Sequence, residues 1–236
     1  MRLIFVRHGE PDYENDCLTE NGIIQAKSTA QRLKKEKISA IFSSPMGRAR
    51  ETASYTAKEQ GIDDIQILDF MHEINWGDAK TPSEKERKLP YEGHPWTLSV
   101  ELLAEHPEYA ENGKWQSHPY FKDNICMEYY NKISTGFDSF LEKFGLIRKN
   151  GLYFCEKACE DTIALFAHGG SGGIMFSHLL NLPLPVAFTT LPYGVCSVSI
   201  INFEGEEGKT TIPRLELFND MNHIDSFKLE KLHFEK

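Results

Sequence analysis

Two short apolar segments, far apart in the chain, both end in a histidine followed by glycine. The first, "LIFVRHG", has an apolar run over residues 3–6 before Arg7 and His8. The second, "TIALFAHGG", has a run over residues 162–167 before His168. Short apolar runs followed by glycine are typical of buried strands. In a parallel sheet the carboxyl ends of the strands lie on one edge, where ligands bind, so this pattern favours a fold that brings the two histidines together.

Strands and helices alternate after the first segment. Thr19 is expected to cap a helix whose lysines, up to Lys37, complement the dipole at its carboxyl end. Residues 38–42 predict a second strand, and "SSPMGRARETASYTAKEQG" predicts a helix with Ser44 as its cap and Pro45 at the first helical position. This alternation is typical of a parallel sheet with crossover helices.

The rest of the chain extends the same pattern around one irregular stretch. A weak strand is expected at 65–68, a helix at 125–144, and a hairpin at one sheet edge in "VCSVSIINFEGEEGKTTIPRLELFND". The stretch at about 80–120 has several prolines and aromatic residues but no clear period, which favours a functional lid. We therefore predict one α/β domain over 1–236 with a cap insertion at about 80–120.

Composition limits the partners and the compartment. The net charge of −9 disfavours nucleic acid and anionic membranes, because both bind basic surfaces. No apolar stretch is long enough to span a bilayer, and the short run before Arg7 does not resemble a secretory signal, so we expect a cytoplasmic protein. The five scattered cysteines are expected to be ordinary thiols; Cys155 and Cys159 suit one helix face, but no second pair completes a zinc site.

Four cationic or titratable side chains follow predicted strands, namely Arg7, His8, Arg48 and His168. Two arginines can clamp the oxygens of a tetrahedral phosphate, and the first turn of a helix, where Arg48 is expected, already favours an anion. A neutral imidazole such as that of His8 can attack phosphorus near pH 7 without a metal. The departing oxygen needs a proton and the hydrolytic water needs a base; Glu73, in "HEINWG", is the best placed carboxyl for both.

The motifs "VRHGE", "LTENGIIQA", "SSPMGRARETA", "HEINWG" and "AHGG" occur in the order and at about the spacing of a known family. With them the chain resembles the histidine phosphatase superfamily, the phosphoglycerate mutase-like proteins. The resemblance implies a three-layer α/β/α sandwich with a mostly parallel central sheet and an inserted, largely helical cap. It implies catalysis by His8, Glu73 and His168, with a phosphohistidine at His8 and Glu73 as acid and base. It also implies, without a metal or other cofactor, phosphate binding by Arg7, Arg48, His168 and Gly169.

The sequence departs from the family's pattern at several positions. Pro11 stands where many members have threonine, and Asn15 lies one position away from an asparagine that often contacts the phosphate, so we expect Asn15 to form a turn. Residues 78–80 replace a tryptophan, glutamate, glycine triplet of many phosphatase members, which leaves Glu73 without a rival as the acid. His223, in "FNDMNHI", matches a late segment of related bacterial phosphatases and is expected to be structural.

These observations favour a metal-independent phosphomonoesterase that hydrolyses a small phosphorylated metabolite through a phosphohistidine. A phosphoglycerate mutase is the first alternative, but the mutases carry a glutamate, arginine, histidine, tyrosine, glycine run where this chain has "EINWG". A non-catalytic phosphate-binding scaffold is the second, and it would be expected to lose His8 or Glu73. We expect no nucleic acid or membrane partner; a homodimer stays open.

Overall fold

The computed structural model describes residues 1–79, 88–111 and 113–224. The chain divides into two compact units. Unit 1 contains Met1–Glu73, Leu141–Gly172 and Tyr193–Lys236, and unit 2 contains Ile74–Phe140 and Gly173–Pro192. A single domain with a cap at about 80–120 stays a prediction, and residues 80–87 and 112 of that stretch lie outside the described part of the chain.

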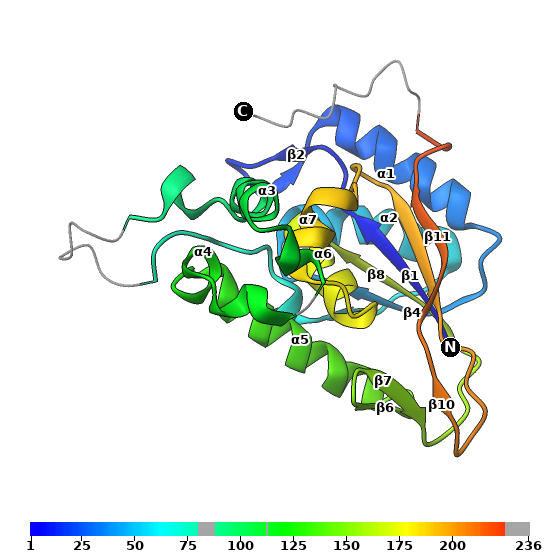
Figure 1. The fold of residues 1–236 in the computed structure, drawn as a ribbon. Coiled ribbons are helices and arrows are strands. Elements are labelled where there is room, and N and C mark those ends of the chain that lie inside the picture. The colour runs from blue at the N-terminus through cyan, green and yellow to red at the C-terminus, as the bar shows by residue number, and fades with distance from the viewer. Residues whose placement is uncertain (80–87, 112, 225–236) are drawn as a thin grey trace. The chain divides into compact units, whose positions relative to one another are not determined.

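Unit 1 is built on a sheet of six described strands in the order β11-β9-β1-β8-β4-β5 (Figure 1). The parallel strands are β1 (Arg2–Arg7), β8 (Thr162–Ala167), β4 (Ile38–Ser43) and β5 (Ile65–Ile67). The antiparallel pair predicted at one edge is confirmed as β9 (Val198–Asn202) and β11 (Arg214–Asp220). The sheet is therefore mixed and mostly parallel, and the predicted α/β class is confirmed.

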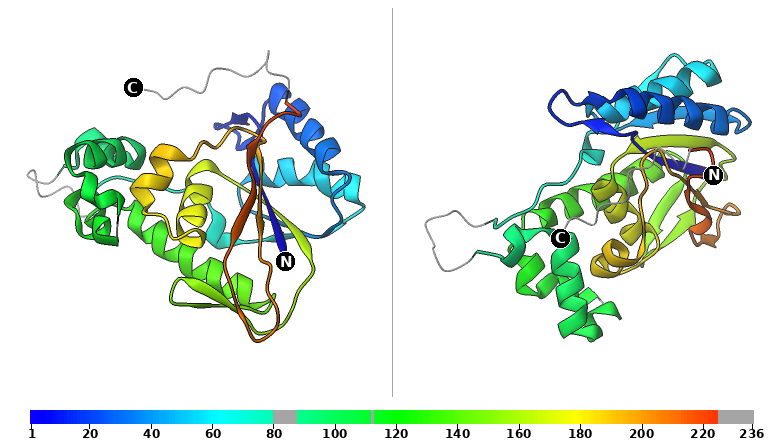
Figure 2. Two further views of the ribbon diagram at one scale, coloured as in Figure 1. Left: turned by 45° about the vertical axis from the view of Figure 1, so that its right-hand side comes forward. Right: turned by 90° about the horizontal axis from the view of Figure 1, so that it is seen from above.

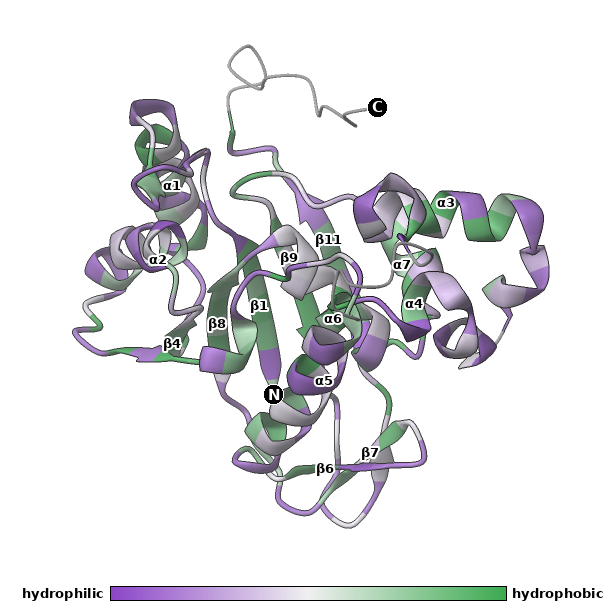
Figure 3. Ribbon diagram, turned by 90° about the vertical axis from the view of Figure 1, so that its left-hand side faces the viewer, coloured by the Kyte–Doolittle hydropathy of each residue, from purple (hydrophilic) through white to green (hydrophobic). Residues whose placement is uncertain are grey.

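Both faces of the central strands are buried, so helices must cover the sheet on two sides. On one face Ile4 and Val6 share a core with Leu33 of α1 (Glu20–Leu33) and Ala53 of α2 (Gly47–Gln60). These two helices lie on the same side of the sheet in Figure 2. Phe5 points to the opposite face because side chains alternate along a strand. There it meets the first turn of α6 (Gly169–Leu179), which completes the third layer. Figure 3 shows the hydrophobic colouring of β1 and β8 between these layers.

The helix boundaries differ in detail from those predicted. Thr19 caps α1 as expected, because its hydroxyl accepts a hydrogen bond from the Gly22 amide at 3.0 Å, but the helix ends at Leu33, before the lysines. The expectation for α2 is wrong: Ser44 does not cap it, and the helix begins at Gly47 with Met46 in the cap position. The Ser44 hydroxyl instead lies 2.7 Å from a ring nitrogen of His168 and accepts from the Met46 amide at 3.3 Å, one residue before the helix begins.

Smaller elements complete unit 1. A three-stranded sheet combines β6 (Leu146–Lys149), β7 (Leu152–Cys155) and β10 (Thr210–Thr211), and a two-stranded sheet pairs β2 (Pro11–Asp12) with β3 (Cys17–Leu18). A 3-10 turn, η1, covers Asp69–Met71. Cys155 lies in a strand, so Cys155 and Cys159 do not share a helix face, contrary to the expectation. All five cysteines, each within the described residues, are free thiols.

Unit 2 contains most of the helix predicted at 125–144, which is confirmed as α5 (Cys126–Glu142), together with shorter helices that the sequence did not reveal. The described elements are α3 (Pro95–Glu105), α4 (Pro119–Lys122), α7 (Leu184–Thr190), most of α5 and 3-10 turns at Pro90–Gly93, Pro107–Ala110 and Gly113–Ser117. Trp96 stacks on Phe188 with ring centroids 4.4 Å apart, which joins α3 to α7. In the described parts of the chain, none of the helices has both the length and the hydropathy needed to cross a bilayer.

Candidate active site

The register of the central sheet brings two histidine rings together. Arg7, the last residue of β1, pairs with Ala167, the last residue of the parallel strand β8. The next residue of each strand is a histidine, and the rings of His8 and His168 lie with their centroids 5.1 Å apart at an interplanar angle of 60°. Both side chains are buried, with 1% and 0% of their surface exposed. The carboxyl edge of the sheet therefore holds the pair that the sequence predicted there.

The hydrogen bonds of His8 fix which of its ring nitrogens can react. Its Nδ1 lies 2.7 Å from the carbonyl oxygen of Gly9, and since a carbonyl can only accept, Nδ1 carries the proton. Nε2 then has a lone pair, which accepts a hydrogen bond from Nε of Arg48 at 3.4 Å. Burial, and after it the charge of Arg7, lowers the pKa of His8 from 6.5 to about 3. His8 is therefore a neutral imidazole at physiological pH.

Arg48 lies in the first turn of α2 and is buried, with 4% of its surface exposed. Its Nη1 donates to Oδ1 of Asp16 at 2.5 Å, and Oδ2 of Asp16 accepts from the Gly47 amide at 2.6 Å. The ring of Tyr13 lies 5.4 Å from the centre of the guanidinium. Asp16 was missed by the sequence reasoning, because it belongs to no motif and its partner lies 32 positions further along the chain.

Arg7 and His168 supply further donors at the same edge. Nη1 of Arg7 donates to the carbonyl oxygen of Tyr193 at 2.5 Å, and its Nε is buried without a partner among the described residues. Arg7 lies against Gly169, where an added Cβ would be 3.6 Å from its Nε. Nε2 of His168 lies 2.7 Å from the hydroxyl of Ser44, while its Nδ1 has no partner in the described part of the chain. Burial is the main cause that lowers the pKa of His168, and the nearby His8 is the second. This ring is therefore also neutral.

The carboxylate of Glu73 lies beside the first turn of α6, the helix that follows His168 in the chain. Its two carboxylate oxygens accept hydrogen bonds from the amides of Gly170 at 3.3 Å and of Ser171 at 3.0 Å. Free amides in the first turn of a helix attract negative charge, which accounts for this contact. The carboxylate is thereby held by the amides two and three residues after His168 in the chain.

Other residues singled out in the sequence support the site from a distance. Asn15 forms a turn as expected, because its side chain donates to Asp12 at 2.8 Å. Glu10 accepts from the side chains of two residues at the start of α1. His223 lies 3.0 Å from the carbonyl oxygen of Cys196, whose amide in turn bonds the carbonyls at the end of β1. The structural role expected of His223 agrees with these contacts.

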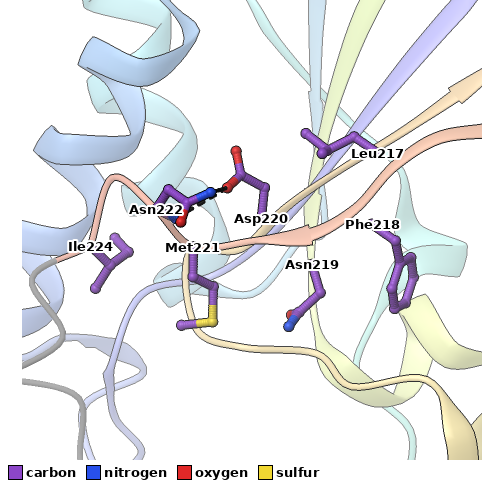
Figure 4. Close-up of a pocket in the computed structure, with 7 residues that line it drawn as sticks. All are labelled: Leu217, Phe218, Asn219, Asp220, Met221, Asn222 and Ile224. Atoms are coloured by element: carbon purple, nitrogen blue, oxygen red, sulfur yellow. Dashed lines mark hydrogen bonds between the residues drawn. The ribbon is translucent and has the colours of Figure 1, made fainter.

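The arrangement suits an anion with a central atom open to attack. Arg48 donates to the lone pair of His8, and the buried nitrogens of Arg7 and His168 that have no partner among the described residues need a ligand or water. Among the described residues, no group of three or more histidine, cysteine, aspartate or glutamate side chains could hold a metal ion. A surface pocket lined by residues 217–222 and Ile224 contains none of the predicted site residues (Figure 4).

The structure is an α/β fold with two histidines and two arginines at or just beyond the carboxyl ends of its parallel strands. The family model described as histidine phosphatase superfamily (branch 1) matches residues 3–214. The chain belongs to this superfamily, as its motifs indicated.

Relatives and solved structures agree on the family but carry different names. A protein of Photorhabdus laumondii named probable phosphoglycerate mutase GpmB is 33% identical over 112 residues, which cover 40% of this chain and 52% of that protein. Its namesake from Escherichia fergusonii is 26% identical over 241 residues, covering 98% and 99% of the two chains. Among solved structures, a mycobacterial glucosyl-3-phosphoglycerate phosphatase has a TM-score of 0.59 at 21% identity, covering 92% of this chain and 98% of its own. A phosphoserine phosphatase mutant from Entamoeba histolytica has a TM-score of 0.61 at 20% identity, covering 94% and 98%. At these identities the two structures show a shared fold alone.

Proposed function

We propose that this protein is a phosphomonoesterase that hydrolyses a small phosphorylated metabolite through a phosphohistidine at His8. The observation that carries the proposal is the hydrogen bond from Nδ1 of His8 to the Gly9 carbonyl, which leaves the lone pair of Nε2 directed at Arg48. A nucleophile needs such a lone pair, and a phosphoryl group needs such cations around it. The low pKa of His8 keeps the nucleophile unprotonated without a neighbouring base.

In the first half of the reaction, Nε2 of His8 attacks phosphorus and the bond to the leaving oxygen breaks. Glu73 gives its proton to that oxygen as general acid. Arg7, Arg48 and His168 donate hydrogen bonds to the non-bridging oxygens, and Gly169 lets the backbone approach them. The two guanidiniums supply positive charge at the oxygens, so the step needs no metal ion.

In the second half, water attacks the phosphorus of the phosphohistidine while Glu73 accepts a proton from that water. The bond between nitrogen and phosphorus breaks, and the lone pair returns to Nε2 of His8. Inorganic phosphate leaves and Glu73 is protonated for the next cycle. One carboxyl thus serves both steps, as microscopic reversibility requires.

The test is hydrolysis of an artificial aryl phosphate by the whole chain. His8→Ala is expected to abolish turnover and the acid-labile phosphoryl adduct that rapid quenching and mass spectrometry detect in the wild type. Arg48→Ala is expected to slow turnover by about 10²- to 10³-fold, through loss of charge stabilisation. Unchanged turnover in His8→Ala would rule out the covalent route.

A phosphoglycerate mutase is the second candidate, favoured by the name of the Escherichia fergusonii relative that aligns along nearly its whole length. It would return the phosphoryl group to a substrate hydroxyl instead of water. Incubation with 3-phosphoglycerate, followed by phosphorus NMR, separates the two: the phosphatase releases inorganic phosphate and the mutase produces 2-phosphoglycerate. The run "EINWG" after His72 supports hydrolysis. We also propose a cytoplasmic location, with neither nucleic acid nor a membrane as a partner.

A further inference from the structure

The loop between β2 and β3 is tied to the beginning of α2 at several points. Asp12 accepts hydrogen bonds from the amides of Glu14 and Asn15 at 3.0 and 3.2 Å, which closes a turn. Asp16 follows in the left-handed conformation, with φ of 48°, which aspartate tolerates better than most residues. The Leu18 amide then donates to Glu51 of α2 at 2.7 Å. The loop therefore has a defined shape and packs against α2 in a fixed position.

Gly47 allows the loop to approach the first turn of α2 closely. A Cβ at this position would lie 2.1 Å from the carbonyl oxygen of Asp16, a distance that backbone atoms cannot accommodate. The absence of a side chain lets the loop approach the first turn of α2, and there the Asp16 carboxylate reaches both the Gly47 amide and Arg48. The sequence thus allows a contact between two segments that no local motif connects.

The guanidinium of Arg48 is consequently held at two points. Nη1 is bonded to Asp16, and Nε, at the far edge of the group, faces His8. The side chain of Arg48 is 5% exposed and that of Asp16 is 40% exposed, so the carboxylate holds the buried cation from the solvent side. An arginine side chain has many rotamers, and restricting it in advance lowers the entropy lost when an oxygen binds it.

We propose that Asp16 is a positioning residue, which fixes Arg48 for transfer of the phosphoryl group and whose negative charge weakens binding of the inorganic phosphate product. This inference rests on the proposed function. Orientation matters most in the transition state, where small misplacements of a catalytic group reduce rates severely. Charge matters for the bound dianion, which a nearby carboxylate repels. Asp16 therefore acts on the rate and on product affinity in different ways.

The experiment compares Asp16→Asn with the wild type. The expected result is a fall in kcat of about tenfold, because arginine orientation is lost. The inhibition constant of inorganic phosphate is expected to fall by about threefold, because a repelling charge is removed while Arg48 stays buried in the site. Loss of folded protein would lower the rate but leave the inhibition constant of phosphate unchanged. The inhibition constant is therefore the readout that a merely structural role of Asp16 would not change.

Two further variants sharpen the comparison. Glu14→Gln removes the same charge from an exposed position of the same loop, and its kcat and phosphate inhibition are expected to match the wild type. In an Arg48→Ala background, Asp16→Asn is expected to change the rate by less than about twofold, because residues that act as a unit are not additive. Asp16→Glu, which keeps the charge, is expected to restore part of the rate.

The outcomes separate this inference from the proposed function. The role of Asp16 is overturned, while hydrolysis stands, by any of three results. These are a wild-type kcat in Asp16→Asn, weaker inhibition of that variant by phosphate, or a fall in kcat that is as large in the Arg48→Ala background as in the wild type. If the wild type hydrolyses no phosphomonoester, the proposed function fails. Calorimetric titration with inorganic phosphate then still tests Asp16, because tighter binding by Asp16→Asn supports its effect on the anion and equal or weaker binding refutes it.

Discussion

Gly172→Ala tests whether the packing of α6 on the sheet holds the site together. A Cβ on Gly172 would lie 2.4 Å from Cζ of Phe5 and 3.0 Å from Cε1, whereas carbon atoms in contact prefer about 3.5 to 4.0 Å. The helix or the ring must therefore move by about 1 Å, and such overpacking costs about 1–3 kcal/mol. Alanine has a higher helix propensity than glycine by up to about 1 kcal/mol, which offsets only part of the cost.

The same displacement reaches the site, because His168 and the amides that hold Glu73 lie at the start of α6. A shift of about 1 Å in a catalytic group is expected to reduce kcat by about 10²-fold. The assays are thermal unfolding, where each kcal/mol lowers Tm by about 2–4 °C in a chain of this size, and turnover of an aryl phosphate. Adding Phe5→Leu to the Gly172→Ala variant removes the ring and is expected to recover part of the lost Tm and part of the lost turnover. Gly113→Ala, where a Cβ meets nothing within 4 Å, is the control. If Gly172→Ala has wild-type Tm and turnover, the packing argument is refuted.

Two other predictions concern charge in the site. Burial lowers the pKa of His8 to about 3, so its neutral form stabilises the fold above about pH 6.5 and that contribution is lost as the pH falls toward 3. His8→Gln is therefore expected to lose less Tm than the wild type between about pH 7 and pH 4; an equal loss would contradict the assignment. Vanadate, which mimics five-coordinate phosphorus, is expected to inhibit hydrolysis competitively, whereas a chelator is expected to leave the rate unchanged. Loss of activity on chelation, restored by a metal, would contradict the metal-free mechanism.

The sheet could be predicted because its strands are short apolar runs with clear ends. Residues 162–167 were predicted as a strand and form β8 with the same limits. The helix α3 could not be predicted, because it lies in a proline-rich and aromatic stretch and has no regular apolar period. Its stability depends instead on tertiary packing, such as the stacking of Trp96 on Phe188, which no local pattern reveals.

The candidate site divides in the same way. The residues that the sequence indicated, such as His8 and His168, stand at strand ends, so topology alone places them on one edge. Asp16 and Ser44 contact the site through side chains of loops whose partners are distant in sequence. Ser44 was interpreted as a helix cap, because serine before proline is typical of one. The competing hydrogen bond to His168 depends on a neighbouring strand and could not be seen in the local sequence.

The geometry of the site depends on strand register more than on any single motif. Arg7 and Ala167 are paired across β1 and β8, and only this pairing puts the two following histidines side by side. A slip of one residue would exchange the two faces of a strand, so that side chains fitted to one helical layer would meet the other. Because both faces of β1 and β8 are buried and interiors are close-packed, such a slip would require the side chains on both faces to repack. The burial that stabilises the sheet therefore also fixes the distance between the two imidazoles, and it lowers the pKa values that keep both rings neutral.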